Sequence, residues 1–327
     1  MNTFTVSITG AIVMVASMRG LTRGYDTPAE QVPEIPAVQT ASFEQAATWL
    51  TSRVATCGLE INAAHRLGVI GGSNALNLLV TSFWQRAYYH IDAYDVGPDA
   101  IKLDIIRVIG KFHTPEAKQA LLAIAKSYWA AGPHKSSHNM MDHEFRCVVV
   151  MTAHELERWA GDDDVHTYAE SVIGSRRFRT LFSDEGYGEI CRAYLIKLRE
   201  VGEMKRNGII SPAEIAQEAA MRLAQMQEQL RKGENPPRDV DAAMKVLITG
   251  LPGDVKSNLY LKAEKDFANT CASIKDLSGQ ASRHGSWTDE MKNRLDPLNI
   301  DSAKCRILIQ YLTMTNHCGL PCCLPLE

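Results

Sequence analysis

Two stretches of this chain, residues 63–80 and 105–122, match each other without a gap when one is shifted by 42 positions. The shift aligns residues of similar kind: Leu67 with Ile109, Gly68 with Gly110, Ile70 with Phe112, Ala75 with Ala117, and Leu79 with Leu121. A fixed period of about 20–50 residues is the signature of a repeat array, in which each repeat is one supersecondary unit. The match therefore predicts a repeat architecture for this part of the chain.

Each copy has the pattern of a helix, a short turn and a second helix. Ser73 and Thr114 are expected as N-caps, because a side-chain oxygen at that position accepts a hydrogen bond from a free N–H group of the next turn. Pro115 suits the first helical position, where the N–H group that it lacks has no partner. A helix pair of this kind has an apolar face that it cannot bury alone, so we expect it to stack against a neighbouring pair.

The pattern Leu-Gly-x-Ile-Gly-x-x-x-Ala-Leu-x-x-Leu, which begins at Leu67, resembles the HEAT repeat, in the variant seen in phycobilisome-lyase-type repeats. A weaker third copy begins at residues 159–165 and continues as a helix to about Ile173. The resemblance covers about residues 43–175 and implies a short solenoid of helical hairpins. It also implies a binding scaffold, since lyase-type members are a minority of the family. A plain helical bundle with two similar hairpins is the alternative.

The composition bounds the class of protein. Hydrophobic residues make up 45% of the 327 residues, charged residues make up 22%, and the formal net charge is −3. These values exclude a disordered chain, and they give no basis for nucleic-acid binding, which favours a basic excess. We predict an all-α fold in four parts: an apolar N-terminal segment with a Pro-rich linker (1–41), the HEAT-like repeats (42–175), a helical C-terminal region (176–316) and a Cys-rich tail (317–327).

The N-terminal segment contains an uncharged apolar run from Phe4 to Met18. This run is shorter than the roughly 20 residues that span a membrane, and it has the length of a signal-peptide core. Small residues near its end favour a signal peptide, whereas the absence of Lys or Arg before Arg19 does not. Export to a bacterial envelope and a cytoplasmic location with a packed N-terminal helix therefore both stay open.

Helix start and stop signals predict the remaining elements. Ser42 is expected to cap a helix that ends at about Cys57, where Gly58 stops it. Further helices are expected at 186–204, 212–232, 239–249 and 254–277, followed by a loop at 279–286, a helix opening at 287–290 and a last helix capped by Asp301. Five cysteines lie among helical apolar positions, where a free thiol behaves as a small hydrophobe: Cys57, Cys147, Cys191, Cys271 and Cys305.

Aromatic side chains are densest at residues 83–90, at the end of the first repeat. The 42-residue period places Trp84 opposite Lys126, within one helical turn of Trp129. Stacked repeats would then bring Trp84, Tyr88, Tyr89 and Trp129 to one end of the array, and exposed aromatic anchors there are typical of a protein-binding edge. The alternative is that these rings fill the joints between repeats.

Two groups of side chains have some character of a metal site. His138 with Asp142, and His143 with Cys147, are pairs four residues apart that share one helix face. The two pairs point about 140° apart on one helix, so they do not close one tetrahedral site, and no metal is predicted. The tail at 317–323 holds one His and three Cys, whose spacing lacks a second zinc-finger pair, and we expect a frayed end.

Residues 244–257 resemble a strand followed by a phosphate-binding loop. Gly250, Lys256 and Ser257 fall in register with the pattern Gly, four residues, Gly, Lys, Ser or Thr, but Val255 takes the place of the second glycine. A β-branched side chain there obstructs the approach of the backbone to phosphates. The other interpretation is a helix, a turn and a new helix from Asp254.

No Ser/His/Asp set or carboxylate pair stands at helical spacing on a repeat face. The sequence therefore predicts a non-enzymatic scaffold for protein–protein interaction, with no catalytic residues and no cofactor. The alternative is an enzyme, either tetrapyrrole-lyase-like, as the repeat resemblance implies, or nucleotide-binding through the degenerate loop at 250–257.

Overall fold

The computed structural model describes residues 35–52, 57–86, 98–132, 140–181 and 187–314, and every regular element in these ranges is a helix. The predicted all-α fold is therefore confirmed. The chain divides into two compact units, whose described residues are 35–155 in unit 1 and 156–314 in unit 2. None of the described helices combines the length and the apolar character that crossing a membrane requires.

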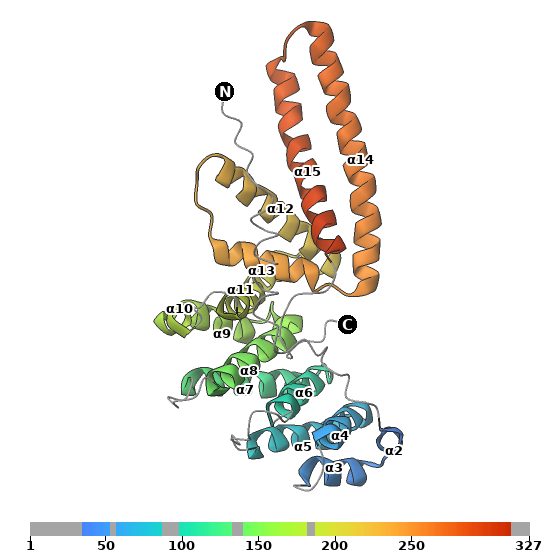
Figure 1. Ribbon diagram of the computed structural model, residues 1–327, viewed down its shortest axis with the longest axis vertical. Helices are drawn as coiled ribbons and strands as arrows, with labels where there is room; N and C mark the ends of the chain where they lie inside the picture. Colours follow the sequence, from blue (N-terminus) through green and yellow to red (C-terminus); the bar gives the residue numbers. More distant parts are fainter. Residues whose placement is uncertain (1–34, 53–56, 87–97, 133–139, 182–186, 315–327) are drawn as a thin grey trace. The chain divides into compact units, whose positions relative to one another are not determined.

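Unit 1 contains helical hairpins that pack in sequence order (Figure 1). Helix α4 packs against α3, α5 and α6, and α6 packs against α5 and α7, so the first helices of the two repeats lie against each other as stacked repeats require. The helices of this unit are α2 (Pro36–Gln39), α3 (Phe43–Thr51), α4 (Cys57–Ile70), α5 (Gly72–Gln85), α6 (Pro98–Gly110), α7 (Pro115–Ala131) and α8 (Met140–Leu156), whose last residue belongs to unit 2.

The 42-residue register describes how the two repeats pack. Aligned core positions are buried in both copies, with an exposed fraction of 0% at each of Leu67, Ile109, Leu79 and Leu121. A Cβ atom added at Gly68 would lie 2.6 Å from Cγ1 of Val108 on α6, so this glycine permits the close approach of α4 to α6. The repeated small residue is thus a packing requirement between neighbouring hairpins.

The caps of unit 1 agree with the sequence in part. The Thr114 hydroxyl accepts a hydrogen bond from the Ala117 N–H group at 3.2 Å, as predicted. Ser73 is not an N-cap: α5 begins at Gly72, and its N-cap, Gly71, has no side-chain bond. Gly71 and Gly72 both have positive φ, at 73° and 81°, and make the turn themselves, so the helix begins before Ser73.

The first long helix is shorter than the sequence predicted. Ser42 caps it, with a reciprocal bond between its N–H group and the Gln45 side chain at 2.9 Å. The helix ends at Thr51, because Ser52 is extended, while Gly58 lies in the first turn of α4 and stops no helix. The Thr51 hydroxyl donates to the Ala47 carbonyl oxygen at 2.8 Å, a local bond that competes with continuation of the helix.

Unit 2 contains a 3-10 turn and seven further helices among its described residues. They are η1 (Glu157–Trp159), α9 (Asp163–Ile173), α10 (Arg176–Leu181), α11 (Tyr187–Arg206), α12 (Pro212–Arg231), α13 (Arg238–Thr249), α14 (Gly253–His284) and α15 (Asp289–Thr313). Helix α11 packs against α9 and α13, and α12 packs against α13 and α15. The predicted helices at 186–204, 212–232 and 239–249 are confirmed to within two residues at each end.

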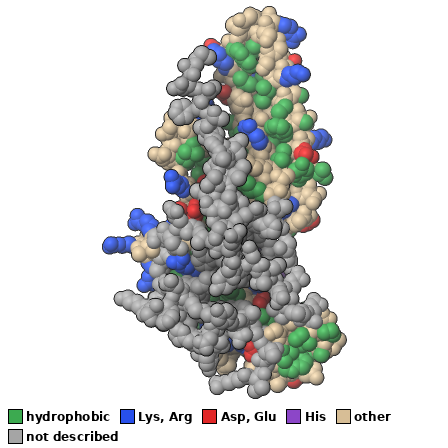
Figure 2. All heavy atoms as spheres, viewed as in Figure 1, with side chains coloured by type: hydrophobic (Ala, Val, Ile, Leu, Met, Phe, Trp, Pro, Cys, Tyr) green, Lys and Arg blue, Asp and Glu red, His purple; other side chains and the backbone are tan. Residues whose placement is uncertain are grey.

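Helices α14 and α15 form one long antiparallel hairpin (Figure 1). Hydrophobic side chains reach the surface of this hairpin (Figure 2). The predicted loop at 279–286 is wrong, because α14 continues through Gly279 and ends only at Gly285, whose φ of 75° suits glycine. The predicted cap at Asp301 is also wrong. Helix α15 starts after Thr288 and runs without interruption through Pro297 and Asp301.

Candidate functional site

Three aromatic rings from the two repeats of unit 1 meet at the ends of α5 and α7. Phe83 packs edge-on against Trp84, with ring centroids 5.1 Å apart and planes at 89°. The Tyr128 ring lies 5.9 Å from Phe83 and 6.4 Å from Trp84. Phe83 and Tyr128 expose only 1% and 6% of their surface, whereas Trp84 exposes 46%. We call Phe83, Trp84 and Tyr128 the aromatic cluster.

A buried lysine from α6 completes this cluster. The Lys102 ammonium donates to the Tyr128 hydroxyl at 3.2 Å and lies 5.7 Å and 6.0 Å from the ring centroids of Phe83 and Tyr128. Its exposed fraction is 2%. Aromatic faces attract a cation, so these contacts compensate in part for the lost hydration of the ammonium and fix both rings.

Lys102 was not among the residues predicted for the site, although the repeat alignment indicates its role. The 42-residue shift aligns Lys102 with Glu60, so both repeats carry a charge at the same position of an apolar helix face. Glu60 is also buried, and Arg86 donates to its carboxylate at 3.0 Å and to the Leu50 carbonyl oxygen at 2.8 Å. A charge repeated on the buried face of a helix indicates a paired buried site.

The two tryptophans predicted to share an edge differ in their surroundings. Trp84 touches the second repeat through Tyr128, the residue before Trp129. Trp129 is half-buried and stacks on Phe145 of α8, with centroids 6.1 Å apart and planes at 27°. Tyr88 and Tyr89 lie outside the described residues.

The weak metal candidates are not assembled by the described part of the chain. His138 and the side chains of Asp142 and His143 lie outside it, and Cys147 is buried at 2% exposure. Among the described residues, no group of three or more His, Cys, Asp or Glu side chains is suited to hold a metal ion. Cys191 and Cys305 are buried as expected, whereas Cys271 is exposed, and the side chain of Cys57 and the tail cysteines are not described.

The phosphate-loop interpretation has no structural basis. Residues 244–249 belong to helix α13, where the pattern requires a strand, and Gly250 caps that helix. Lys256 and Ser257 lie inside α14, whose first turn is closed by the bond from the Lys256 N–H group to the Pro252 carbonyl oxygen at 2.8 Å. The segment is the helix, turn and helix of the other interpretation.

Buried charges in unit 2 are paired and explain packing. The Lys197 ammonium lies 2.6 Å from the Glu157 carboxylate. The Glu200 carboxylate accepts bonds from Arg199 at 2.6 Å and from Arg222 at 2.5 Å. Since these partners come from η1, α11 and α12, the charges join elements of the unit, as buried ion pairs with satisfied geometry do.

We compared the chain with models of protein families, with curated proteins and with solved structures. No match was found in any of the three. The resemblance to HEAT repeats accordingly rests on the 42-residue repeat of the sequence.

Proposed function

We propose that the chain is a non-enzymatic scaffold of HEAT-repeat type, which binds a protein partner through the exposed ring of Trp84. The observation that carries the proposal is the contrast within the aromatic cluster, where Trp84 exposes 46% of its surface above two buried rings. Tryptophan is among the residues most enriched at interface positions that dominate binding energy. We call the surface at Trp84 the Trp84 edge.

The base of the Trp84 edge favours binding because it is rigid. Phe83 is packed in the core, and Tyr128 is held by the bond from Lys102. A ring that already contacts fixed neighbours loses little side-chain freedom when a partner covers it, so more of the interaction energy appears as affinity. With these contacts in place, Trp84 still exposes 46% of its surface to a partner.

An enzymatic alternative has less support from the described residues. His65 lies 3.4 Å from Asp104, a contact of the kind that orients a catalytic histidine. The same Asp104 oxygen accepts a bond from Arg107 at 3.0 Å, and the pair joins α4 to α6. These contacts are those of a structural link between helices α4 and α6 of the stacked repeats. No described feature favours the lyase-type alternative.

The test is affinity capture from the cell of origin with three versions of the full chain: wild type, Trp84→Ala and Val69→Ala. Val69 is the matched control, because it is an apolar residue of unit 1 with an exposed fraction of 77%. We expect quantitative mass spectrometry to identify proteins that are captured by the wild type and by Val69→Ala but not by Trp84→Ala.

A stability measurement separates binding from packing. Loss of partners with a melting temperature within about 2 °C of the wild type supports the Trp84 edge, whereas a fall of about 4 °C or more indicates a ring that fills a joint between repeats. Equal capture by Trp84→Ala and by the wild type would refute the proposal.

A further inference from the structure

Helix α14 carries hydrophobic side chains on a side that stays open to solvent. At 100° per residue, five of them between residues 260 and 271 fall within about a third of the helix circumference. Leu261 exposes 65% of its surface, and Ala268 and Cys271 are exposed as well. Tyr260 and Phe267 are half-buried. A continuous exposed surface of this kind marks an interaction site more often than scattered single residues do.

The packing of the hairpin explains why this side is open. The side chains of α14 that are buried in the hairpin are centred about 120° away around the helix: Leu259, Ala263, Leu277 and Ala281. Within the described part of the chain, α15 is the main neighbour of α14, and α12 contacts it to a lesser extent. The helix thus has one hydrophobic side for the hairpin and a second one beside it.

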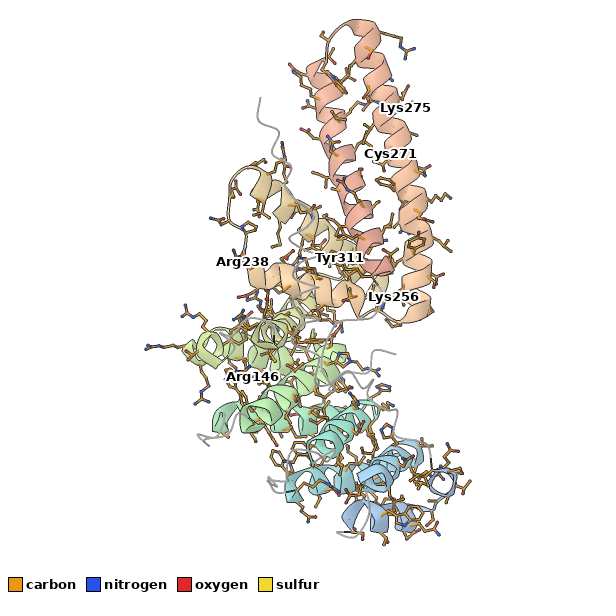
Figure 3. The ribbon with its side chains drawn as sticks, viewed as in Figure 1. Arg146, Arg238, Lys256, Cys271, Lys275 and Tyr311 are labelled. Atoms are coloured by element: carbon orange, nitrogen blue, oxygen red, sulfur yellow. The ribbon has the colours of Figure 1, made fainter. Side chains whose placement is uncertain are left out.

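Two charged residues of opposite sign lie on the same open side, Glu264 toward its start and Lys275 toward its end. Figure 3 labels Lys275, about one turn beyond Cys271. Every residue three or four positions from either charge is uncharged, so neither has an ion-pair partner on its own helix. Among the described residues, Glu264 accepts a hydrogen bond from the Tyr260 hydroxyl at 2.5 Å, and neither charge takes part in an ion pair. We call the hydrophobic surface with these two charges the α14 face.

The charges are placed as a self-complementary surface requires. An isologous interface joins residue i of one copy to residue j of the other and j to i. A two-fold axis midway between Glu264 and Lys275, at right angles to the helix, therefore sets each glutamate beside the lysine of the other copy. The same axis sets Ala268 beside Cys271 of the other copy, so the side chains at the centre are small and the two helices can approach closely.

We propose that the α14 face binds the α14 face of a second copy of this chain, as an antiparallel pair of helices. The pair contains two contacts between Glu264 and Lys275 and covers Leu261 and Phe267 of both copies. A helix with charges of one sign would pair one of the two residues and oppose the other, whereas the same face turned by half a turn pairs both. The site lies in unit 2 and does not rest on the Trp84 edge.

Charge reversal with rescue tests the pairing in the full chain. Sedimentation velocity should show a reversible monomer–dimer equilibrium with a Kd between about 1 and 100 µM. Glu264→Lys and Lys275→Glu each create two like-charge contacts and should each weaken dimerisation about 5- to 30-fold. An equimolar mixture of the two variants should dimerise as the wild type does, because every contact then joins a lysine to a glutamate. A wild type that is monomeric up to about 300 µM, or a mixture that dimerises no better than either variant alone, overturns the proposal.

Matched controls separate this contact from a general effect of charge. Lys265→Glu and Asp276→Lys change the charge by the same amounts at exposed positions of α14 outside the α14 face. We expect each to leave the Kd of the dimer within about twofold of the wild type. Weakening as large as that caused by Glu264→Lys and Lys275→Glu would overturn the proposal.

Cross-linking of Cys271 locates the axis. This exposed thiol is about one and a half residues from the proposed axis, so the Cα atoms of its two copies would be roughly 10 Å apart in helices packed at the usual distance. A short bismaleimide should join Cys271 to Cys271 in a mixture of ¹⁵N-labelled and unlabelled chains, and mass spectrometry identifies the mixed-isotope peptide pair. Glu264→Lys should lower its yield. Absence of this pair at concentrations where the wild type is dimeric would overturn the proposal, because another surface would then form the dimer.

Discussion

The two repeats of unit 1 and the α14–α15 hairpin of unit 2 are both pairs of long helices, but they bury their residues to different degrees. In the repeats, each of α4 and α6 packs against several helices, and the aligned residues Leu67, Ile109, Leu79 and Leu121 are fully buried. In the hairpin, the tip cluster is limited to Leu277, Ala281, Met291 and Leu298. Although α15 also packs against α12 and α13, this tip cluster contains residues of α14 and α15 alone, so the helices of the stack are supported on more sides than the tip of the hairpin.

This difference has consequences for what each region tolerates. Close-packed interiors respond to the loss or gain of single methyl groups. A two-helix seam adapts more readily, because its helices can approach each other. We expect equivalent substitutions to lower the free energy of unfolding more in the repeats than in the hairpin. At some positions, we expect them to lower it in the repeats and raise it in the hairpin.

The largest effect is expected from core truncation. Leu79→Ala and Leu121→Ala should each lower the free energy of unfolding of unit 1 by about 2–5 kcal/mol, since both residues are fully buried and their neighbours come from several helices. Leu277→Ala in the hairpin should cost about 2 kcal/mol or less, because its two helices can close the gap. Chemical denaturation with hydrogen-exchange mass spectrometry resolves the two regions.

Exposed positions on the same helices provide the control. Asn77→Ala and Gln119→Ala should change the free energy of unfolding by about 0.5 kcal/mol or less. Equal losses for these and for the two leucines would contradict the 42-residue register. A larger loss at Leu277 than at Leu79 would contradict the comparison between the regions.

The next effect concerns Pro297, an exposed residue inside α15. Proline in a helix interior removes one backbone hydrogen bond and crowds the preceding turn. Pro297→Ala should therefore stabilise the hairpin by about 1–3 kcal/mol and slow hydrogen exchange in α15 without changing exchange in unit 1. Faster exchange in α15 would show that the hairpin depends on a proline-induced bend.

The sequence predicted the fold best where periodicity and caps agreed. The bounds of α11, α12 and α13 were predicted closely because their caps and stops are local, as at Ser211 and Gly233. Predictions failed where a single residue was taken as a stop signal. Gly58 and Gly279 both lie within helices, because contacts along the whole element outweigh one unfavourable residue.

The candidate site could be predicted only in part. Repeat spacing located Trp84 near the end of α7, but it did not distinguish the exposed Trp84 from Trp129, which stacks on Phe145. That distinction depends on α8, which lies outside the aligned repeats.

Glycine-to-alanine substitutions should change the free energy of unfolding in opposite directions in the two regions. Gly68→Ala places a Cβ atom 2.6 Å from Val108, a buried and stiff side chain, and should destabilise unit 1 by about 1–3 kcal/mol. Gly279→Ala places its Cβ atom in open space in the interior of α14 and should stabilise the hairpin by about 0.5–1 kcal/mol. Thermal unfolding of both variants measures whether each substitution raises or lowers stability. A change in the same direction for both variants would refute the difference between the two regions.

The last expected effect tests the polar contact between α4 and α6. Burial alone would raise the pKa of Asp104, but the hydrogen bonds and charges of His65 and Arg107 together outweigh burial and lower it. A carboxyl group with a lowered pKa in the folded state stabilises that state above its ordinary pKa of 3.8, and the contribution disappears as the pH falls through the folded value. The Asp104 contribution should therefore be present at pH 7 and reduced at pH 3.

Asp104→Asn is a clean probe of this contact because the first repeat has Asn62 at the aligned position, where its amide donates to the Gly58 carbonyl oxygen at 2.8 Å. The variant should be about 1 kcal/mol less stable than the wild type at pH 7, the scale of a typical intramolecular hydrogen bond. That difference should narrow at pH 3, below the ordinary carboxyl pKa of 3.8, because the unfolded chain takes up its proton there before the folded chain does. Chemical denaturation of both proteins at pH 7 and at pH 3 measures this difference in stability. A difference of the same size at both would mean that Asp104 holds α4 to α6 through its shape and not through its charge.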